Sequence, residues 1–239
     1  MKINDNIEVL DVNDIYATTL GIRTDESIAW YKSARSNLRS AKALLDNKQY
    51  PHSVFFLQQS IECVVKAIVL ENKVIDNAKI FSHSPEKALE LFYKKMNSGS
   101  MEFCVKIKDR MKDLNDFESR IVEMAAQVNS QAKEYMEIER MKDINGFLVN
   151  KEAVVAIGLP GSAISDEVAY KFIFRKQFVL NLVYCFSILF STTQQSSRYP
   201  TYVNGNLLIQ TQQYSLPKII EGLATILPWF DFILQEVYE

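Results

Sequence analysis

Glycine and proline are scarce in this chain of 239 residues, which contains 7 glycines and 6 prolines. An all-β fold needs many tight turns, and these turns depend on both residues, so their scarcity disfavours that class. The chain also has only 3 cysteines and 2 histidines, with no CxxC pair or Cys/His cluster. The sequence therefore predicts no metal site and no disulfide framework, and it favours reduced, buried thiols in a cytoplasmic protein.

An excess of charge of one sign is also lacking, because the net charge is -2. The total charge therefore gives no general affinity for nucleic acid, although a local basic patch is compatible with it. The most apolar stretch is about 13 residues long, over 178–190. A membrane span needs roughly 20, so we expect a core helix and no membrane partner. The polar, acidic first residues do not resemble a signal peptide.

Sequence motifs of the common enzyme classes are absent too. The chain contains no GxxxxGK[ST] or GxGxxG phosphate loop and no GxSxG nucleophile elbow. We therefore expect no cofactor, and the sequence leans against an enzyme.

The main pattern in the sequence is the recurrence of apolar residues at spacings of three and four, and this spacing indicates helices. The pattern predicts a lead-in over 1–24, then one helical domain over 25–239. Within it we expect helices over residues 27–47, 51–72, 84–96, 101–142, 166–190 and 215–237. The fourth of these fits either one helix or two helices that break near Asn129-Ser130. Residues 147–165 are the least helical part and fit a short β-hairpin or an ordered loop.

Residues 30–73 resemble the first two helices of HEPN domains. The likeness is carried by a Leu-Leu pair, a Tyr in the turn, and an aromatic-Gln-Gln helix with Glu and Lys on one face: Leu44, Leu45, Tyr50, Phe56, Gln58, Gln59, Glu62 and Lys66. Two later segments, FSHSPEKALELF (81–92) and SSRYP (196–200), resemble further elements of the family in the same order. The likeness extends over 27–96 and roughly 170–237.

The resemblance implies an all-α, up-and-down helical bundle. A helical or irregular insertion at about 100–165 would separate the third and fourth bundle helices. It also implies homodimers, and a role among toxins, antiviral proteins or RNA-processing factors. A nucleotidyltransferase-like antitoxin would be a matching partner for a toxin of this kind.

Active HEPN members cleave RNA with an Arg, then four to six intervening residues, and then a His. Histidine suits the proton transfer, and arginine suits the charged phosphate. Here Arg198 lies at the position of the family Arg, but Asn204 stands where the His is expected. An amide cannot shuttle protons near neutral pH, so we expect no cleavage by the family mechanism. A rearranged catalytic site would use Arg198, Asn204 and either His83 or His52.

Two groups of residues are candidates for binding a ligand. A basic stripe runs along the first helix, with no acidic residue between Glu26 and Asp46: Lys32, Arg35, Arg39 and Lys42. It could track phosphates, or it could be an ordinary solvated helix face. The second group could hold a nucleotide, with a guanidinium on the phosphate and a ring beneath the base, or it could simply build a turn between helices: Arg198, Tyr199 and Tyr202.

Three functional hypotheses follow from the sequence. The first is a homodimeric binding or regulatory module for RNA, a nucleotide or a partner protein in stress or phage defence. The second is a metal-independent ribonuclease toxin with a rearranged site. The third is a purely structural interaction protein. Fold resemblance alone does not separate them, because one fold serves many functions.

Overall fold

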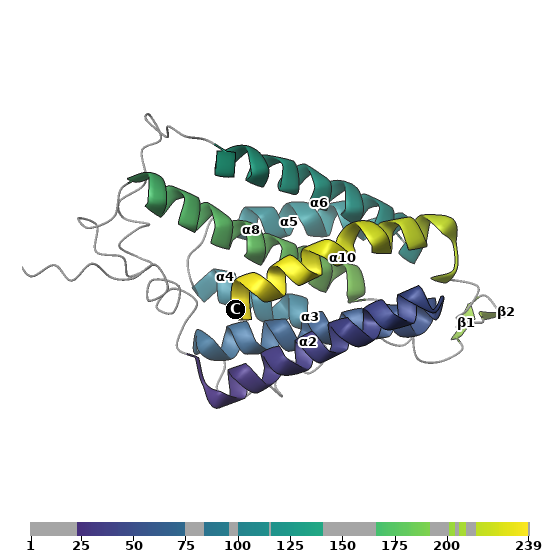
Figure 1. Cartoon of the computed structure of the whole chain (residues 1–239). Helices are drawn as coiled ribbons and strands as arrows, with labels where there is room; N and C mark the ends of the chain where they lie inside the picture. The colour runs from purple at the N-terminus through teal and green to yellow at the C-terminus, as the bar shows by residue number, and fades with distance from the viewer. Residues whose placement is uncertain are drawn as a thin grey trace, which may run out of the picture.

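The computed structural model describes residues 23–74, 84–95, 100–114, 116–140, 166–191, 201–203, 206–208 and 214–238. In these ranges the chain is helical apart from one small hairpin, which confirms the predicted all-α class. The helices are α2 (Asp25–Asp46), α3 (Tyr50–Glu71), α4 (Pro85–Lys95), α5 (Ser100–Lys112), α6 (Phe117–Arg140), α8 (Asp166–Phe190) and α10 (Pro217–Tyr238). Figure 1 shows α2 and α3 side by side along one side of the bundle, with α10 between this pair and α6.

Helix α2 begins two residues before the predicted start because a capping box precedes its apolar face. The hydroxyl of Thr24 accepts from the backbone N–H of Ser27, and the Ser27 hydroxyl accepts from the backbone N–H of Thr24. These two bonds satisfy donors that a helix start otherwise leaves without partners. The buried face then repeats every three or four residues, at Ser27, Tyr31, Ala34, Leu38 and Ala41.

Helices α2 and α3 pack closely because small residues face each other. The hydroxyl of Ser53 donates to the carbonyl of Ala41 at 2.8 Å, and that of Ser60 donates to the carbonyl of Ala34 at 2.9 Å. Such bonds satisfy buried hydroxyls without any water between the helices. Helix α3 is long and apolar enough to cross a membrane, but 72% of its most apolar window is buried inside the bundle, as in the core helix of a soluble protein.

The predicted helix over 101–142 is two helices, and the predicted position of their break was wrong. Asn129 and Ser130 are exposed positions within α6. The chain instead leaves α5 after Lys112 and starts α6 at Phe117. The Asp116 carboxylate accepts from the backbone N–H of Ser119 at 2.7 Å and from its hydroxyl at 2.9 Å. An aspartate at this position caps a helix start, which is why the chain breaks here.

Both helices of this segment belong to the main core. Their buried apolar side chains join the same hydrophobic cluster as those of α2 and α3: Cys104, Ile107, Met111, Ile121, Met124 and Val128. The segment had been expected to form an insertion over 100–165. Residues 141–165, which include the expected hairpin or loop at 147–165, lie outside the described residues.

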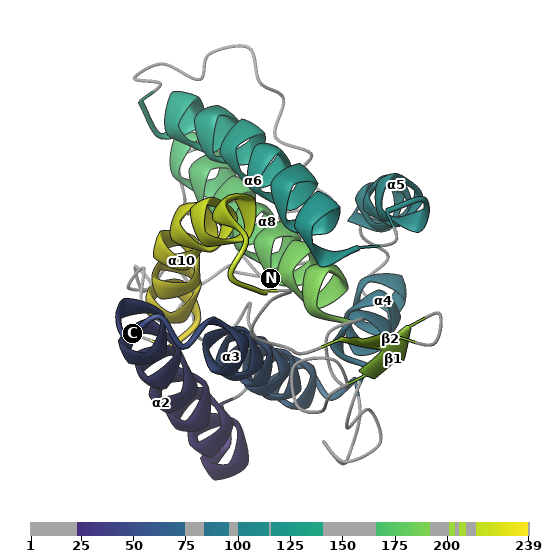
Figure 2. The ribbon, with the colours of Figure 1, turned by 90° about the vertical axis from the view of Figure 1, so that its right-hand side faces the viewer.

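Helix α8 occupies the centre, as its apolar character on all sides predicts. Figure 2 shows α6, α10 and α3 around it, with α2 on the outer side of α3 and α10. The rings of Phe186 and Phe230 stack with centroids 4.5 Å apart and so join α8 to α10. Helix α10 begins at Pro217 rather than at the predicted Ser215, because a proline ring suits the first helical position. It continues through Pro228.

A short antiparallel hairpin accompanies the helices at one end of the bundle (Figure 1). Strand β1 (Thr201–Val203) pairs with β2 (Asn206–Leu208), with Thr201 opposite Leu208 and Val203 opposite Asn206. The strands flank the expected Asn204-Gly205 turn, whose two residues lie outside the described ranges.

Candidate functional site

The predicted basic stripe lies on the side of α2 adjacent to its buried face, as expected. Lys32 and Arg39 are exposed, whereas Arg35 and Lys42 are partly buried. A helix rises 1.5 Å per residue, so Lys32 and Arg39 are about 10 Å apart along the axis. Neither of these two side chains forms an ion pair within the part of the chain that the structure describes. Their charges therefore remain available to an anionic ligand.

Lys42 differs from the other members of the stripe, because its ammonium forms an ion pair with Asp231 of α10. The two side chains are 37% and 46% exposed, so water screens the pair and its contribution to stability is small. The sequence did not reveal this partner, which lies 189 residues away along the chain. The exposed part of the stripe is thus Lys32 and Arg39, and Lys42 joins α2 to α10.

A second polar strip lies on α3. Glu62 and Lys66 form the expected i,i+4 ion pair at 2.7 Å, but their side chains are only 6% and 13% exposed. The pair is therefore largely buried in the chain rather than at its open surface. The Lys66 ammonium also lies 4.6 Å from the ring centroid of Trp30 on α2, in a cation–π contact. These contacts hold the lysine charge close to the α2–α3 seam.

Three buried polar atoms of this strip lack a hydrogen-bond partner among the residues described: Gln58 Oε1, Gln59 Nε2 and Glu62 Oε2. An unsatisfied buried polar atom costs roughly 1–3 kcal/mol. All three atoms are buried within the chain, so a ligand or a second chain could reach them only if these side chains moved.

A buried carboxylate, which the sequence did not single out, closes the far end of the α2–α3 pair. Glu71 is 2% exposed and accepts from the Ser27 hydroxyl at 3.0 Å and from the Tyr31 hydroxyl at 2.9 Å. Burial raises its pKa, and the hydrogen bonds from Tyr31 and Ser27 oppose this shift. Each carboxylate oxygen of Glu71 accepts one of these hydroxyls, so the Glu71 side chain is a structural link between α3 and α2.

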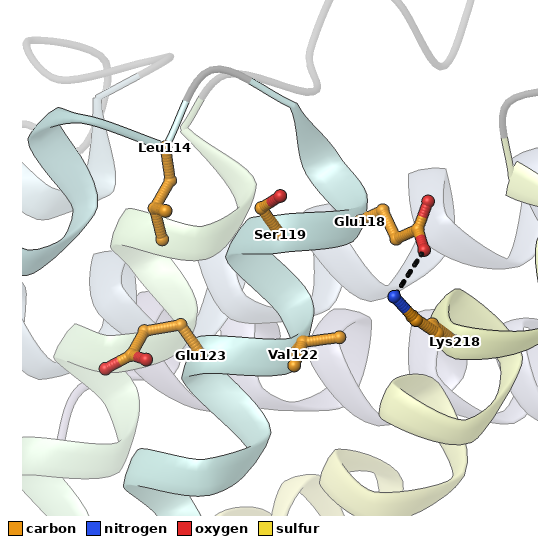
Figure 3. Close-up of a pocket in the computed structure, with 6 residues that line it drawn as sticks. All are labelled: Leu114, Glu118, Ser119, Val122, Glu123 and Lys218. Carbon is orange, nitrogen blue, oxygen red and sulfur yellow. Dashed lines mark ion pairs between the residues drawn. The ribbon is translucent and has the colours of Figure 1, made fainter.

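One surface pocket lies between α6 and the start of α10 (Figure 3). Its volume is about 260 Å³, and it is lined by Leu114, Glu118, Ser119, Val122, Glu123 and Lys218. Glu118 forms an ion pair with Lys218 at 3.6 Å, and Glu123 forms one with Arg110 at 3.4 Å. The charges on its rim are thus already neutralised, and none of the predicted site residues lines it.

Most of the second predicted group lies outside the described residues, namely Arg198 and Tyr199, and so do the catalytic candidates Asn204 and His83. Tyr202 is in β1, but its side chain is not described. His52 is exposed in the first turn of α3. The structure therefore does not test whether the nucleotide pocket or the rearranged ribonuclease site forms.

Metal-ligating side chains do not gather in the described residues, where no group of three or more His, Cys, Asp or Glu could hold an ion. The three cysteines are free and buried, as predicted. They lie on three different helices, α3, α5 and α8.

Comparison with known families identifies the bundle. Residues 28–139, from α2 to α6, match the model of the HEPN domain. The match confirms the resemblance found in the sequence, and it includes α5 and α6 from the segment expected to be an insertion. It does not extend over α8 and α10. No curated protein and no solved structure matches the chain.

Proposed function

We propose that the protein is a homodimeric binding module for RNA and that the exposed basic stripe of α2 contacts the phosphates. A HEPN domain indicates a module related to RNA or nucleotides. The observation that carries the proposal is the pair of exposed, unpaired cations Lys32 and Arg39 on a helix face without acidic residues. Lysine and arginine on such a face bind the backbone independently of base sequence and release counterions.

The stripe is tested by reversing its two exposed charges. In Lys32→Glu/Arg39→Glu we expect the affinity for a labelled single-stranded RNA to fall on the order of tenfold, with a shallower dependence on salt. Fluorescence anisotropy at several salt concentrations measures both. The matched control is Lys87→Glu/Lys133→Glu, which changes the net charge equally at exposed positions of α4 and α6. If both double variants lose affinity equally, the stripe is not the binding surface.

We propose a homodimer because HEPN domains commonly dimerise. Light scattering coupled to size exclusion measures the mass in solution. A particle of the 27.5 kDa chain mass at all concentrations would contradict the dimer.

Binding without cleavage is the expected outcome for the bound RNA. Incubation with total RNA in EDTA separates this function from the ribonuclease alternative. Intact RNA is expected with the wild type and with Arg198→Ala. Cleavage that is lost in Arg198→Ala would identify a ribonuclease with a rearranged site instead.

A cytoplasmic location and a role in stress or phage defence belong to the same proposal, and the buried free thiols support the location.

A further inference from the structure

An acidic side chain from another helix reaches the basic stripe of α2. Helix α10 lies beside α2 in both views of the bundle (Figures 1 and 2), and the Asp231 carboxylate of α10 forms an ion pair with the Lys42 ammonium. Lys42 follows Arg39 by three residues, so these two cations are neighbours on α2, about 4.5 Å apart along its axis. The stripe therefore ends at a cation that already has an anionic partner.

The carboxylate side of this ion pair has a fixed position in the bundle. Phe230 directly precedes Asp231, is 1% exposed, and stacks on the ring of Phe186 in the central helix α8. One turn after Asp231, the Glu236 carboxylate forms an ion pair with Arg175, which is also on α8. Helix α10 cannot move away from α2 without breaking these contacts. The backbone at Asp231 therefore stays in place when a ligand reaches α2.

The lysine side of the ion pair is the flexible one. Lysine carries a compact charge on a stem of four carbons, and this stem has several rotatable bonds. The side chains of Lys42 and Asp231 are both partly exposed, so an anion in solution can approach the ammonium. An ion pair with this exposure is weak and is screened by salt. Lys42 can thus exchange one anionic partner for another.

We propose that Asp231 pairs with Lys42 in the free protein and that a phosphate of the bound RNA takes the place of this carboxylate. The proposal rests on the proposed function, in which RNA phosphates contact Lys32 and Arg39. The exchange adds a third cation to these contacts and leaves the Asp231 charge near the bound strand. Because the ion pair must first be broken, Lys42 adds less affinity than a lysine without a partner would add. Asp231 therefore limits how tightly the stripe binds RNA.

The exchange is tested with a double-mutant cycle on the full chain. Fluorescence anisotropy measures the affinity for a labelled single-stranded RNA. Lys42→Gln should weaken binding about threefold more in the Asp231→Asn background than in the wild type, because Lys42 then has no partner to leave. Equal losses in the two backgrounds, with RNA bound by the wild type, would overturn the exchange alone. If no variant binds RNA, the proposed function fails and the exchange fails with it.

Asp231→Asn by itself gives a second measure. In the wild type the released carboxylate takes up cations from solution, which offsets part of the counterion release that favours binding. The variant should therefore bind RNA about threefold more tightly, with a steeper dependence on salt. The control is Glu221→Gln, which removes an exposed acidic charge of the same helix about 15 Å away, beyond the screening length of roughly 8 Å at physiological salt. An equal gain in the control would overturn the proposal, since the net charge would then explain it.

Discussion

Glu71 shows how one buried carboxyl group can make stability depend on pH. Burial is the main cause of its raised pKa. A group with a raised folded-state pKa contributes stability that is fully present below its unfolded pKa, roughly 4.3 for glutamate. That contribution is lost as the pH rises through the higher folded-state pKa. Ionised Glu71 is therefore less favourable in this site than a neutral side chain of the same shape.

We predict that Glu71→Gln is at least as stable as the wild type near pH 8, because the amide retains the shape without the charge. Glu71→Ala leaves the hydroxyls of Ser27 and Tyr31 without their partner and should cost about 2–4 kcal/mol. Urea unfolding followed by circular dichroism near pH 5 and pH 8 measures both. Equal losses in the two variants near pH 8 would show that the charge itself is required.

At the residue scale, the sequence revealed the stripe cations but not their partners. Lys32 and Arg39 could be predicted as exposed, because helical spacing places them outside the apolar face. The partner of Lys42 could not be predicted, since Asp231 approaches it only when α10 packs on α2. The Glu71 network has the same cause, because its members Ser27 and Tyr31 lie on another helix.

Gly222 shows at the scale of elements how closely α6 and α10 approach. A Cβ atom added at this position would lie 2.8 Å from Cγ1 of Ile121 and 3.2 Å from its Cδ1 and Cγ2. Ile121 is fully buried in α6, so it has little room to move. The absence of a side chain at Gly222 thus sets the distance between these two helices.

We predict that Gly222→Ala destabilises the protein by about 1 kcal/mol. Overpacking costs roughly 1–3 kcal/mol, and the better helix propensity of alanine recovers roughly 0.5–1 kcal/mol. Urea unfolding measures the difference. The control is the same substitution in an Ile121→Ala background, where the clash is absent and the alanine should be neutral or stabilising. A loss of equal size in both backgrounds would exclude the clash as its cause.

At this scale, periodicity predicted most helices because the spacing of apolar residues is local information. The break near Asn129-Ser130 was wrong because polar residues are tolerated on the exposed side of a helix. The true break depends on the Asp116 cap, whose effect exceeds that of two exposed polar residues. The α10 start was misplaced by two residues because Ser215 and Pro217 are both acceptable near a helix start.

The three thiols report on the whole bundle, since they lie on α3, α5 and α8. Burial raises the pKa of Cys63 to about 11 and that of Cys104 to about 12, and it raises the pKa of Cys185 further. Only the thiolate reacts with disulfide reagents. All three cysteines are therefore protected by their pKa and by the packing around them.

We predict that none of the three thiols reacts with a chromogenic disulfide near pH 8 until the bundle opens. All three should react rapidly in urea, where both forms of protection are lost. Absorbance over time measures the rate at each urea concentration, and mass spectrometry identifies the labelled cysteine. Cys63 should react first, since it is the most exposed of them at 7%. Rapid labelling of Cys185 without urea would contradict the packing of α8 at the centre.

For the whole molecule, the sequence predicted an all-helical bundle, which the described residues confirm. It also predicted a resemblance to HEPN domains, which the family match confirms over residues 28–139. It did not predict that α5 and α6 join the main core, because the resemblance prescribes nothing for that stretch. Their buried residues have helical spacing, which shows an apolar face but not the helix it meets. The sites expected near Arg198 stay predictions, since those residues are outside the described ranges.

The contact between Arg23 and the Val237 carbonyl brings the entry to α2 beside the exit from α10. The first and the last described helix of the chain therefore start and end next to each other. A short linker could join these two points, and the chain could be opened between α6 and α8 without separating any described helix from its neighbours. Domains with adjacent ends tolerate such circular permutation. The same adjacency means that a reporter fused after α10 would lie next to the start of α2.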